Sequence, residues 1–165
     1  SKFAKGKKVG YIANDVFTAR KEVKYYKDLF NIKAEKAYIK DFEDWKTQFK
    51  KLQKTVDMVI VGNVSGIKGW NESAAEEFVL NNTIKPTGCI YSWVSKFALI
   101  SVTVLPEEQG HWAAQTALKI LSGTKPSEIP ITKNKKGKII LNQKIAEILE
   151  IKFDDNLKKG AEIIK

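Results

Sequence analysis

Few side chains in this sequence are suited to catalysis. The chain contains one histidine, His111, and one cysteine, Cys89, whereas a reactive nucleophile needs an adjacent base and a zinc site needs several Cys or His ligands. The phosphate-binding pattern G-x-x-x-x-G-K-[ST], the dinucleotide-binding pattern G-x-G-x-x-G and the nucleophile elbow G-x-S-x-G are absent. The sequence therefore predicts no enzymatic activity, no metal site and no cofactor.

A second set of side chains is suited to holding a small molecule. Amide and hydroxyl groups follow several apolar runs, and aromatic side chains lie near them in the sequence. Free backbone N–H groups at helix N-termini attract carboxylates, and a few polar groups beside aromatic walls are typical of ligand pockets. The alternative is that these residues are helix caps and turn residues. The candidate ligand-binding residues are Asn14, Asp15, Phe17, Thr18, Asn63, Ser65, Gly66, Ser92 and Trp93.

Alternating strands and helices must position these candidates. Apolar runs predict strands over residues 8–12, 34–39, 57–62, 89–92 and 98–104. Apolar residues at a 3-4-3-4 spacing, together with cap and stop signals, predict helices over residues 16–30, 42–56, 72–81 and 106–121. The first of these helices has Asn14 and Asp15 as its expected caps.

Strands that alternate with helices form parallel sheets, because each parallel connection needs a crossover. The predicted fold is therefore α/β, a three-layer open parallel sheet with helices on both faces. Ligands of such sheets bind at the carboxyl ends of the strands. This rule selects residues 14–18, 40–42, 63–66 and 92–96, which include every candidate binding residue.

The sequence changes character after residue 123. Residues 124–138 are rich in proline and lysine and predict an extended connection. A strand over 138–141 and helices over 142–149 and 153–165 are expected to follow. We therefore divide the chain into a ligand-binding lobe, residues 1–123, and a C-terminal segment, residues 124–165, which packs either on this lobe or on another.

The formal net charge of +10 raises the question of nucleic-acid binding. Arg20 is the only arginine among 29 basic residues, whereas nucleic-acid sites favour the bidentate guanidinium. The lysines are scattered over the polar faces of the predicted helices, so a solvated surface is the preferred interpretation. A phosphoacceptor domain needs an aspartate at the end of the third strand, where this chain has Asn63.

The C-terminal half carries three linked motifs. They are E-x-G-x-x-A-A-x-x-A-x-x-I-L-x-G from Glu108 to Gly123, K-P-x-x-I-P from Lys125 to Pro130, and I-x-L-N-x-x-x-A around Ile140, Leu141, Asn142 and Ala146. This combination resembles the C-terminal half of the ABC-transporter substrate-binding proteins of the periplasmic-binding-protein type I fold. The branch is the one whose characterised members bind aromatic amino acids. The earlier part of the chain is similar in element order and in the Gly62-Asn63 pair after the third strand.

The resemblance implies that this chain is the C-terminal lobe of a two-lobed protein whose N-terminal lobe is absent. The ligand of such proteins sits between lobes that close by a hinge. The loops after the first, third and fourth strands would face it, namely residues 14–18 and 63–66 and the pair Ser92-Trp93. Relatives often carry an acidic residue after the fourth strand, where this chain has Tyr91-Ser92-Trp93.

The sequence thus predicts an extracytoplasmic solute-binding component of an ABC-type uptake transporter. We expect its ligand to be a small molecule such as an amino acid or a small carboxylate. The expected partners are the N-terminal lobe and a membrane permease, with no nucleic acid, in a monomeric protein. The expected location is periplasmic or extracytoplasmic, with the signal peptide or lipid anchor outside this sequence. The alternative is a ligand-sensing domain of a membrane receptor such as a histidine kinase.

Overall fold

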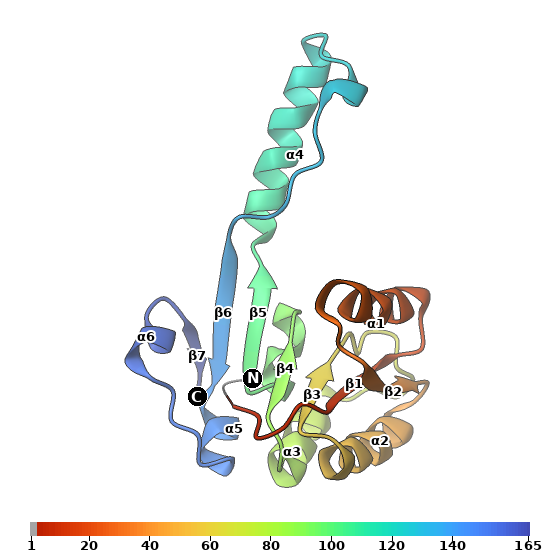
Figure 1. Ribbon diagram of the computed structural model, residues 1–165, viewed down its shortest axis with the longest axis vertical. Helices are drawn as coiled ribbons and strands as arrows, with labels where there is room; N and C mark the ends of the chain where they lie inside the picture. Colours follow the sequence, from red (N-terminus) through yellow and green to blue (C-terminus); the bar gives the residue numbers. More distant parts are fainter. Residues whose placement is uncertain (1–2) are drawn as a thin grey trace.

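A seven-stranded sheet forms the centre of the molecule in the computed structural model of Figure 1, and the structure describes residues 3–165. The strand order is β2-β1-β3-β4-β5-β6-β7, and neighbouring strands are parallel except for β5 and β6. The predicted α/β fold is therefore confirmed, although the sheet predicted to be parallel contains one antiparallel pair, β5 and β6. The strands are β1 Val9–Asn14, β2 Ala34–Ile39, β3 Met58–Val61, β4 Thr87–Cys89, β5 Ile100–Val104, β6 Gly137–Asn142 and β7 Glu162–Ile164.

A helix lies in each connection between the first five strands, as parallel pairing requires. The first three predicted helices each differ from the observed ones by a single residue at one end, and the helix predicted over 106–121 has the predicted bounds. The helices are α1 Phe17–Phe30, α2 Phe42–Thr55, α3 Glu72–Asn82, η1 Ser92–Phe97, α4 Pro106–Leu121, η2 Pro126–Glu128, α5 Gln143–Ile148 and α6 Asp155–Lys158. The helices η1 and η2 are of the 3₁₀ type.

Helix α2 supplies the largest part of the hydrophobic core. The side chain of Asp41, the N-cap residue, accepts a hydrogen bond from the backbone N–H of Asp44 at 2.9 Å. The apolar positions at 3-4-3-4 spacing are all buried, as predicted. They are Phe42, Trp45, Phe49, Leu52 and Val56. The indole of Trp45 packs at the centre of an aromatic cluster that also contains Trp70 and Phe97.

Helix α1 covers the opposite face of the sheet. Because side chains alternate along a strand, Tyr11 and Ala13 of β1 face α1 while Ile12 faces the larger core. Ala19 and Val23 are the buried residues of α1. The predicted apolar stripe of this helix is wrong at its ends, since Val16 and Phe30 are both exposed. The sheet therefore buries only the middle of the helix.

Residues 105–136, here called the arm, extend away from the sheet. Figure 1 shows α4 projecting beyond β5 and the chain returning along it to β6. None of the residues of α4 is buried, although an amphipathic helix normally buries its apolar stripe. The arm exposes five large apolar side chains: Trp112, Leu118, Ile120, Leu121 and Ile131. It therefore carries an apolar surface that nothing in the described chain covers.

Residues 137–165 of the C-terminal segment pack on this sheet, whereas residues 124–136 belong to the arm. Strand β6 pairs with β5 antiparallel, and β7 pairs with β6 parallel. The helix predicted over 153–165 is wrong, because only the four residues of α6 are helical and β7 follows. Gly160 has φ +80, a conformation that interrupts a helix. The β-branched residues Ile163 and Ile164 then favour the strand.

The predicted fourth strand is displaced. Strand β4 ends at Cys89, whereas the apolar run 89–92 suggested that it begins there. Residues Ser92–Phe97 instead form η1. The Ser95 hydroxyl donates to the Ser92 carbonyl oxygen at 2.6 Å, a local bond that competes with strand pairing.

Candidate functional site

The loops after β1 and β3 meet at the carboxyl ends of these strands. The backbone N–H of Asn14 donates to the Asn63 carbonyl oxygen at 2.9 Å. The side-chain amide Nδ2 of Asn14 donates to the carbonyl oxygen of Ser65. Gly66 has φ +86, a left-handed conformation that suits glycine, and its position lies close to Asn14 Nδ2. Four of the candidate residues are thus joined by the main chain and one buried amide.

The side chain of Asn14 is the most buried polar group of this junction. Its residue is only 6% exposed, and its Oδ1 has no hydrogen-bond partner among the described residues. A buried acceptor without a donor is destabilising, so such groups are found where a ligand or water completes the hydrogen bonding. At this junction the described residues therefore leave the hydrogen bonding of the buried Asn14 Oδ1 incomplete.

Asn63 joins the junction to the aromatic side chain of Trp93. Its Oδ1 accepts the indole Nε1–H of Trp93 at 3.2 Å and the backbone N–H of Ser65 at 3.0 Å. Trp93 is 54% exposed, and its ring centroid lies 4.9 Å from that of Tyr91. A large aromatic surface at the strand ends is therefore open to a stacking partner.

The N-terminus of α1 completes this side of the site. The N-cap residue is Val16, which makes no side-chain cap hydrogen bond. The predicted capping by Asn14 and Asp15 is therefore wrong, since the Asp15 carboxylate pairs with Arg20 instead. Phe17 is 77% exposed and Thr18 is exposed as well. The first turn of α1 has no acidic residue, so its N–H groups can receive a carboxylate.

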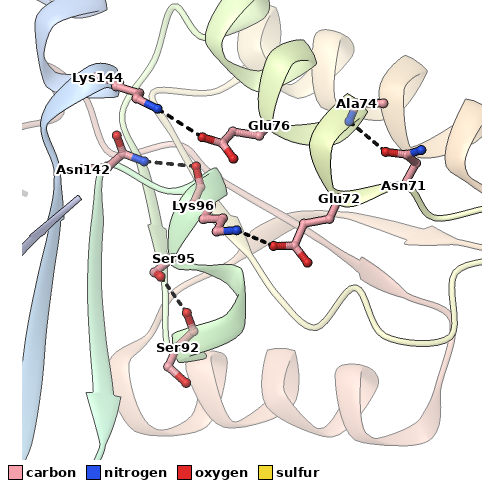
Figure 2. Close-up of polar contacts among 9 residues, drawn as sticks. All are labelled: Asn71, Glu72, Ala74, Glu76, Ser92, Ser95, Lys96, Asn142 and Lys144. Atoms are coloured by element: carbon pink, nitrogen blue, oxygen red, sulfur yellow. Dashed lines mark hydrogen bonds and ion pairs between the residues drawn. The ribbon is translucent and has the colours of Figure 1, made fainter. Parts of the chain in front are cut away.

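Ser92 is placed apart from this network. It is exposed, and its carbonyl oxygen accepts the hydrogen bond from the Ser95 hydroxyl within η1. Figure 2 shows two contacts that hold Lys96 of η1. Asn142 Nδ2 donates to the Lys96 carbonyl oxygen at 3.0 Å, and Lys96 Nζ pairs with Glu72 at 2.6 Å. The C-terminal end of η1 is therefore fixed to β6 and α3, and Ser92 and Trp93 are the first two residues of η1.

We expect Asn142→Ala to lower the free energy of unfolding by about 2 kcal/mol. Asn142 is 2% exposed, and its Oδ1 also caps α5 by accepting the Ile145 N–H at 3.1 Å. Its loss leaves the buried backbone N–H of Ile145 and the partly buried carbonyl oxygen of Lys96 without these partners. Urea unfolding would measure the change, with Asn71→Ala as control. Asn71 is an exposed N-cap of α3, and a loss in Asn142→Ala no larger than in this control would contradict the expectation.

A carboxylate that the sequence did not single out lies beside the site. Glu22 of α1 accepts hydrogen bonds from the hydroxyl groups of Tyr11, at 2.9 Å, and of Tyr91. Burial, followed by the charge and hydrogen bond of Glu22, raises the pKa of both tyrosines above its ordinary value. Burial and then the Glu22 charge raise the pKa of Tyr26 to about 12. The only sequence signal was the position of Glu22 next to the apolar stripe of α1.

These raised pKa values make the protein sensitive to alkaline pH. A tyrosine of the unfolded chain ionises near pH ~10, whereas Tyr26 keeps its proton in the folded state up to its pKa of about 12. The stabilisation is therefore complete below pH ~10 and is lost as the pH rises toward ~12. Urea unfolding at pH ~9 and pH ~11 should show a drop in stability. An equally steep drop in Tyr26→Phe would exclude Tyr26 as its source.

Gly62, which follows β3, leaves room for this arrangement. A Cβ at this position would lie 2.7 Å from the Tyr11 hydroxyl oxygen and 2.8 Å from the Ala13 Cβ. Distances this short are not tolerated between non-bonded heavy atoms. The glycine before Asn63 therefore serves the close approach of Tyr11 to the end of β3.

The described chain can also be set against the requirements of a metal site, a membrane-spanning helix and an enclosed pocket. Among residues 3–165, no group of three or more His, Cys, Asp or Glu side chains could hold a metal ion. No helix in this range has both the length and the apolarity to cross a membrane. A cavity of about 1150 Å³ lies in the arm, between α4 and residues 126–136, and not at the strand ends. The candidate site is therefore an open surface of this lobe.

Comparisons with known proteins agree with this arrangement. The family described as ABC transporter substrate binding protein matches residues 2–165. No curated protein sequence matches the chain. Among solved structures, a ligand-free, open substrate-binding protein with adhesive properties from Clostridium difficile is 20% identical, with a TM-score of 0.72 over 99% of this chain and 56% of that one.

Two further solved structures are similar. An ABC domain in complex with L-Trp from Streptococcus pneumonia is 19% identical, with a TM-score of 0.63 over 96% of this chain and 56% of that one. A conserved domain protein from Vibrio cholerae O1 biovar eltor is 19% identical, with a TM-score of 0.64 over 96% of this chain and 55% of that one.

The chain spans about half the length of these three structures. At such low identity the structures show the fold, whereas the family match covers nearly the whole sequence. The family is one of substrate-binding proteins rather than enzymes. This chain belongs to the ABC transporter substrate-binding protein family and has the fold of a type I periplasmic binding protein.

Proposed function

We propose that the chain is the C-terminal lobe of the extracytoplasmic solute-binding component of an ABC-type uptake transporter. The observation that carries the proposal is the junction of Asn14, Asn63 and Trp93 at the strand ends. It combines a buried, unpaired amide oxygen with an open aromatic surface. Such a surface binds a small molecule well only when a second wall closes over it. The lobe supplies one wall of a cleft, and no group in it transforms the ligand.

The arm supports the assignment as one of two lobes. It leaves α4 without a buried residue and exposes Trp112, Leu118 and Ile120. Soluble monomers rarely expose a contiguous apolar surface of this kind. The similar solved structures are nearly twice as long as this chain. We assign the arm as the docking element for the N-terminal lobe of the same protein, with the membrane permease as the further partner.

The ligand is proposed to be an amino acid or a small carboxylate. The uncapped N-terminus of α1 suits a carboxylate, and the Oδ1 of Asn14 suits an ammonium or another donor. Trp93 suits an apolar or aromatic side chain of the ligand. The similar domain from Streptococcus pneumonia is in complex with L-Trp. Tyr91-Ser92-Trp93 supplies no carboxylate for a ligand ammonium, and the Asp15 carboxylate already pairs with Arg20.

A thermal-shift screen of the complete protein against amino acids and small carboxylates tests the proposal. A ligand at a hundredfold excess over Kd stabilises the native state by about 2.7 kcal/mol. We expect Asn63→Ala to abolish most of this stabilisation and the matched control Asn81→Ala, on the exposed end of α3, to keep it. Absence of stabilisation by every solute, or equal loss in both variants, would count against the proposed site.

A further inference from the structure

Glu22 lies between two tyrosines that are distant in the sequence, one in strand β1 and one in the loop after β4. Its Oε2 accepts the hydroxyl of Tyr11, in β1, at 2.9 Å. Its Oε1 accepts the hydroxyl of Tyr91, which directly precedes η1 and lies 69 residues away in the sequence. One carboxylate therefore ties α1 to the first strand and to the start of η1.

The ring of Tyr91 also contacts Trp93, so Glu22 is linked to Trp93 through Tyr91. The two rings are 4.9 Å apart between centroids, with an interplanar angle of 39°. The protein covers less than half of the Trp93 surface, so few contacts determine its orientation. Besides its contact with the Tyr91 ring, the indole donates a hydrogen bond from Nε1 to Asn63 Oδ1 at 3.2 Å. The position of Trp93 therefore depends on Tyr91 on one side and on Asn63 on the other.

The hydrogen bonds from the two tyrosines to Glu22 are strong enough to fix the orientation of the tyrosine rings. A hydrogen bond from a phenol to a carboxylate is charge-assisted and stronger than one between neutral groups. Tyr11 is fully buried and Tyr91 is partly buried, and burial raises the pKa of both. Both hydroxyl groups are therefore protonated at neutral pH and remain donors to Glu22.

We propose that Glu22 is a positioning residue of the binding surface, which fixes the Tyr91 ring and, through it, the orientation of Trp93. Glu22 reaches neither Asn14 nor Asn63 by a hydrogen bond in the described structure, so it acts through the aromatic pair. The proposal rests on the proposed function only where it says that Trp93 faces a ligand. It adds that two of the candidate loops, those starting at Asp15 and Ser92, keep their relative position through this one side chain.

The orientation of Trp93 can be tested without any ligand. The complete protein is labelled with 5-fluorotryptophan, and the ¹⁹F resonance of Trp93 is assigned by its loss in Trp93→Phe. We expect Glu22→Gln and Tyr91→Phe each to shift this resonance by more than its line width. The double variant should shift it no further than the larger single shift, because both changes break the same connection.

The matched control is Asp28→Asn, which removes one negative charge from the same helix. Asp28 pairs with Lys24 and is exposed, so the Trp93 resonance should stay in place. A role of Glu22 limited to stabilising α1 predicts lower thermal stability with an unmoved Trp93 resonance. That result in Glu22→Gln, or additive shifts in the double variant, would overturn the proposal.

Binding of L-tryptophan, measured by calorimetry, separates this proposal from the proposed function. If the complete protein binds this probe, Glu22→Gln and Tyr91→Phe should each raise Kd by about tenfold, the effect of one lost charge-assisted hydrogen bond. Unchanged Kd values beside a shifted Trp93 resonance would contradict a role for Trp93 in binding and leave its positioning by Glu22 intact. An unmoved resonance would overturn the positioning whatever the binding result.

Discussion

Trp45→Ala is expected to lower the free energy of unfolding by about 3–5 kcal/mol. The indole of Trp45 is fully buried, and its ring centroid lies 5.0 Å from that of Trp70 and 5.2 Å from that of Phe49. Alanine leaves a cavity at the centre of this cluster, which a close-packed interior fills only in part. Since domains of this size are stable by about 5–15 kcal/mol, urea unfolding should show a large shift of the midpoint.

Two further variants separate the cavity from other effects of the substitution. Trp93→Ala removes the same side chain from a site that is 54% exposed, so its cost should stay within about 1 kcal/mol. Trp45→Phe keeps a six-membered aromatic ring and removes the buried Nε1–H, which has no partner among residues 3–165. Its cost should therefore be smaller than that of alanine. Equal losses in Trp45→Ala and Trp93→Ala would contradict the assignment of the core.

If the arm docks on an N-terminal lobe, as proposed, Trp112→Glu is expected to separate the two in the complete protein. Trp112 lines the cavity of the arm and is 43% exposed in this lobe. A central tryptophan of an interface commonly contributes about 2–4 kcal/mol, and a charge in its place is costly to bury. Small-angle X-ray scattering should then give a larger radius of gyration, and ligand binding should weaken by more than about tenfold.

The control for this prediction places the same charge elsewhere on the arm. Ser127→Glu lies in η2, outside the lining of the cavity, so it should leave the scattering curve and the ligand affinity unchanged. If Trp112→Glu behaves like Ser127→Glu, the arm does not dock through this surface. If the arm docks a second copy of the chain instead, the wild-type protein should be dimeric and Trp112→Glu monomeric.

Periodicity and end signals predicted the elements whose burial is one-sided. The stripe from Phe42 to Val56 is buried as expected, and α4 begins at Pro106 and ends at Leu121 as its proline and the following Ser122-Gly123 indicated. Spacing alone, however, does not tell what covers a stripe. Helix α4 has the pattern of a packed helix and buries no residue here.

The errors arose where tertiary pairing or a side-chain partner decided the structure. Ile163 and Ile164 extend the sheet because β6 offers a free edge, which a helical spacing around Leu157 could not reveal. Asp15 binds Arg20 rather than the helix N-terminus. Glu22 escaped notice because its partner Tyr91 is distant in the sequence. The strand-end rule, by contrast, needs only the order of the elements, and it led to Asn14 and Asn63.

The close packing around Gly62 restricts which residues evolution can accept at this position. Its backbone has an ordinary negative-φ conformation, unlike Gly66 and Gly69, so no turn requires a glycine there. What requires it is volume, since a single methyl group would meet the Tyr11 hydroxyl. In a mutational scan this position should tolerate no other residue, although it is far from solvent and has no side chain to bind anything. A side chain at position 62 would also lie 2.8 Å from the Ala13 Cβ, so divergence at this position within the family should be accompanied by smaller residues at both position 11 and position 13.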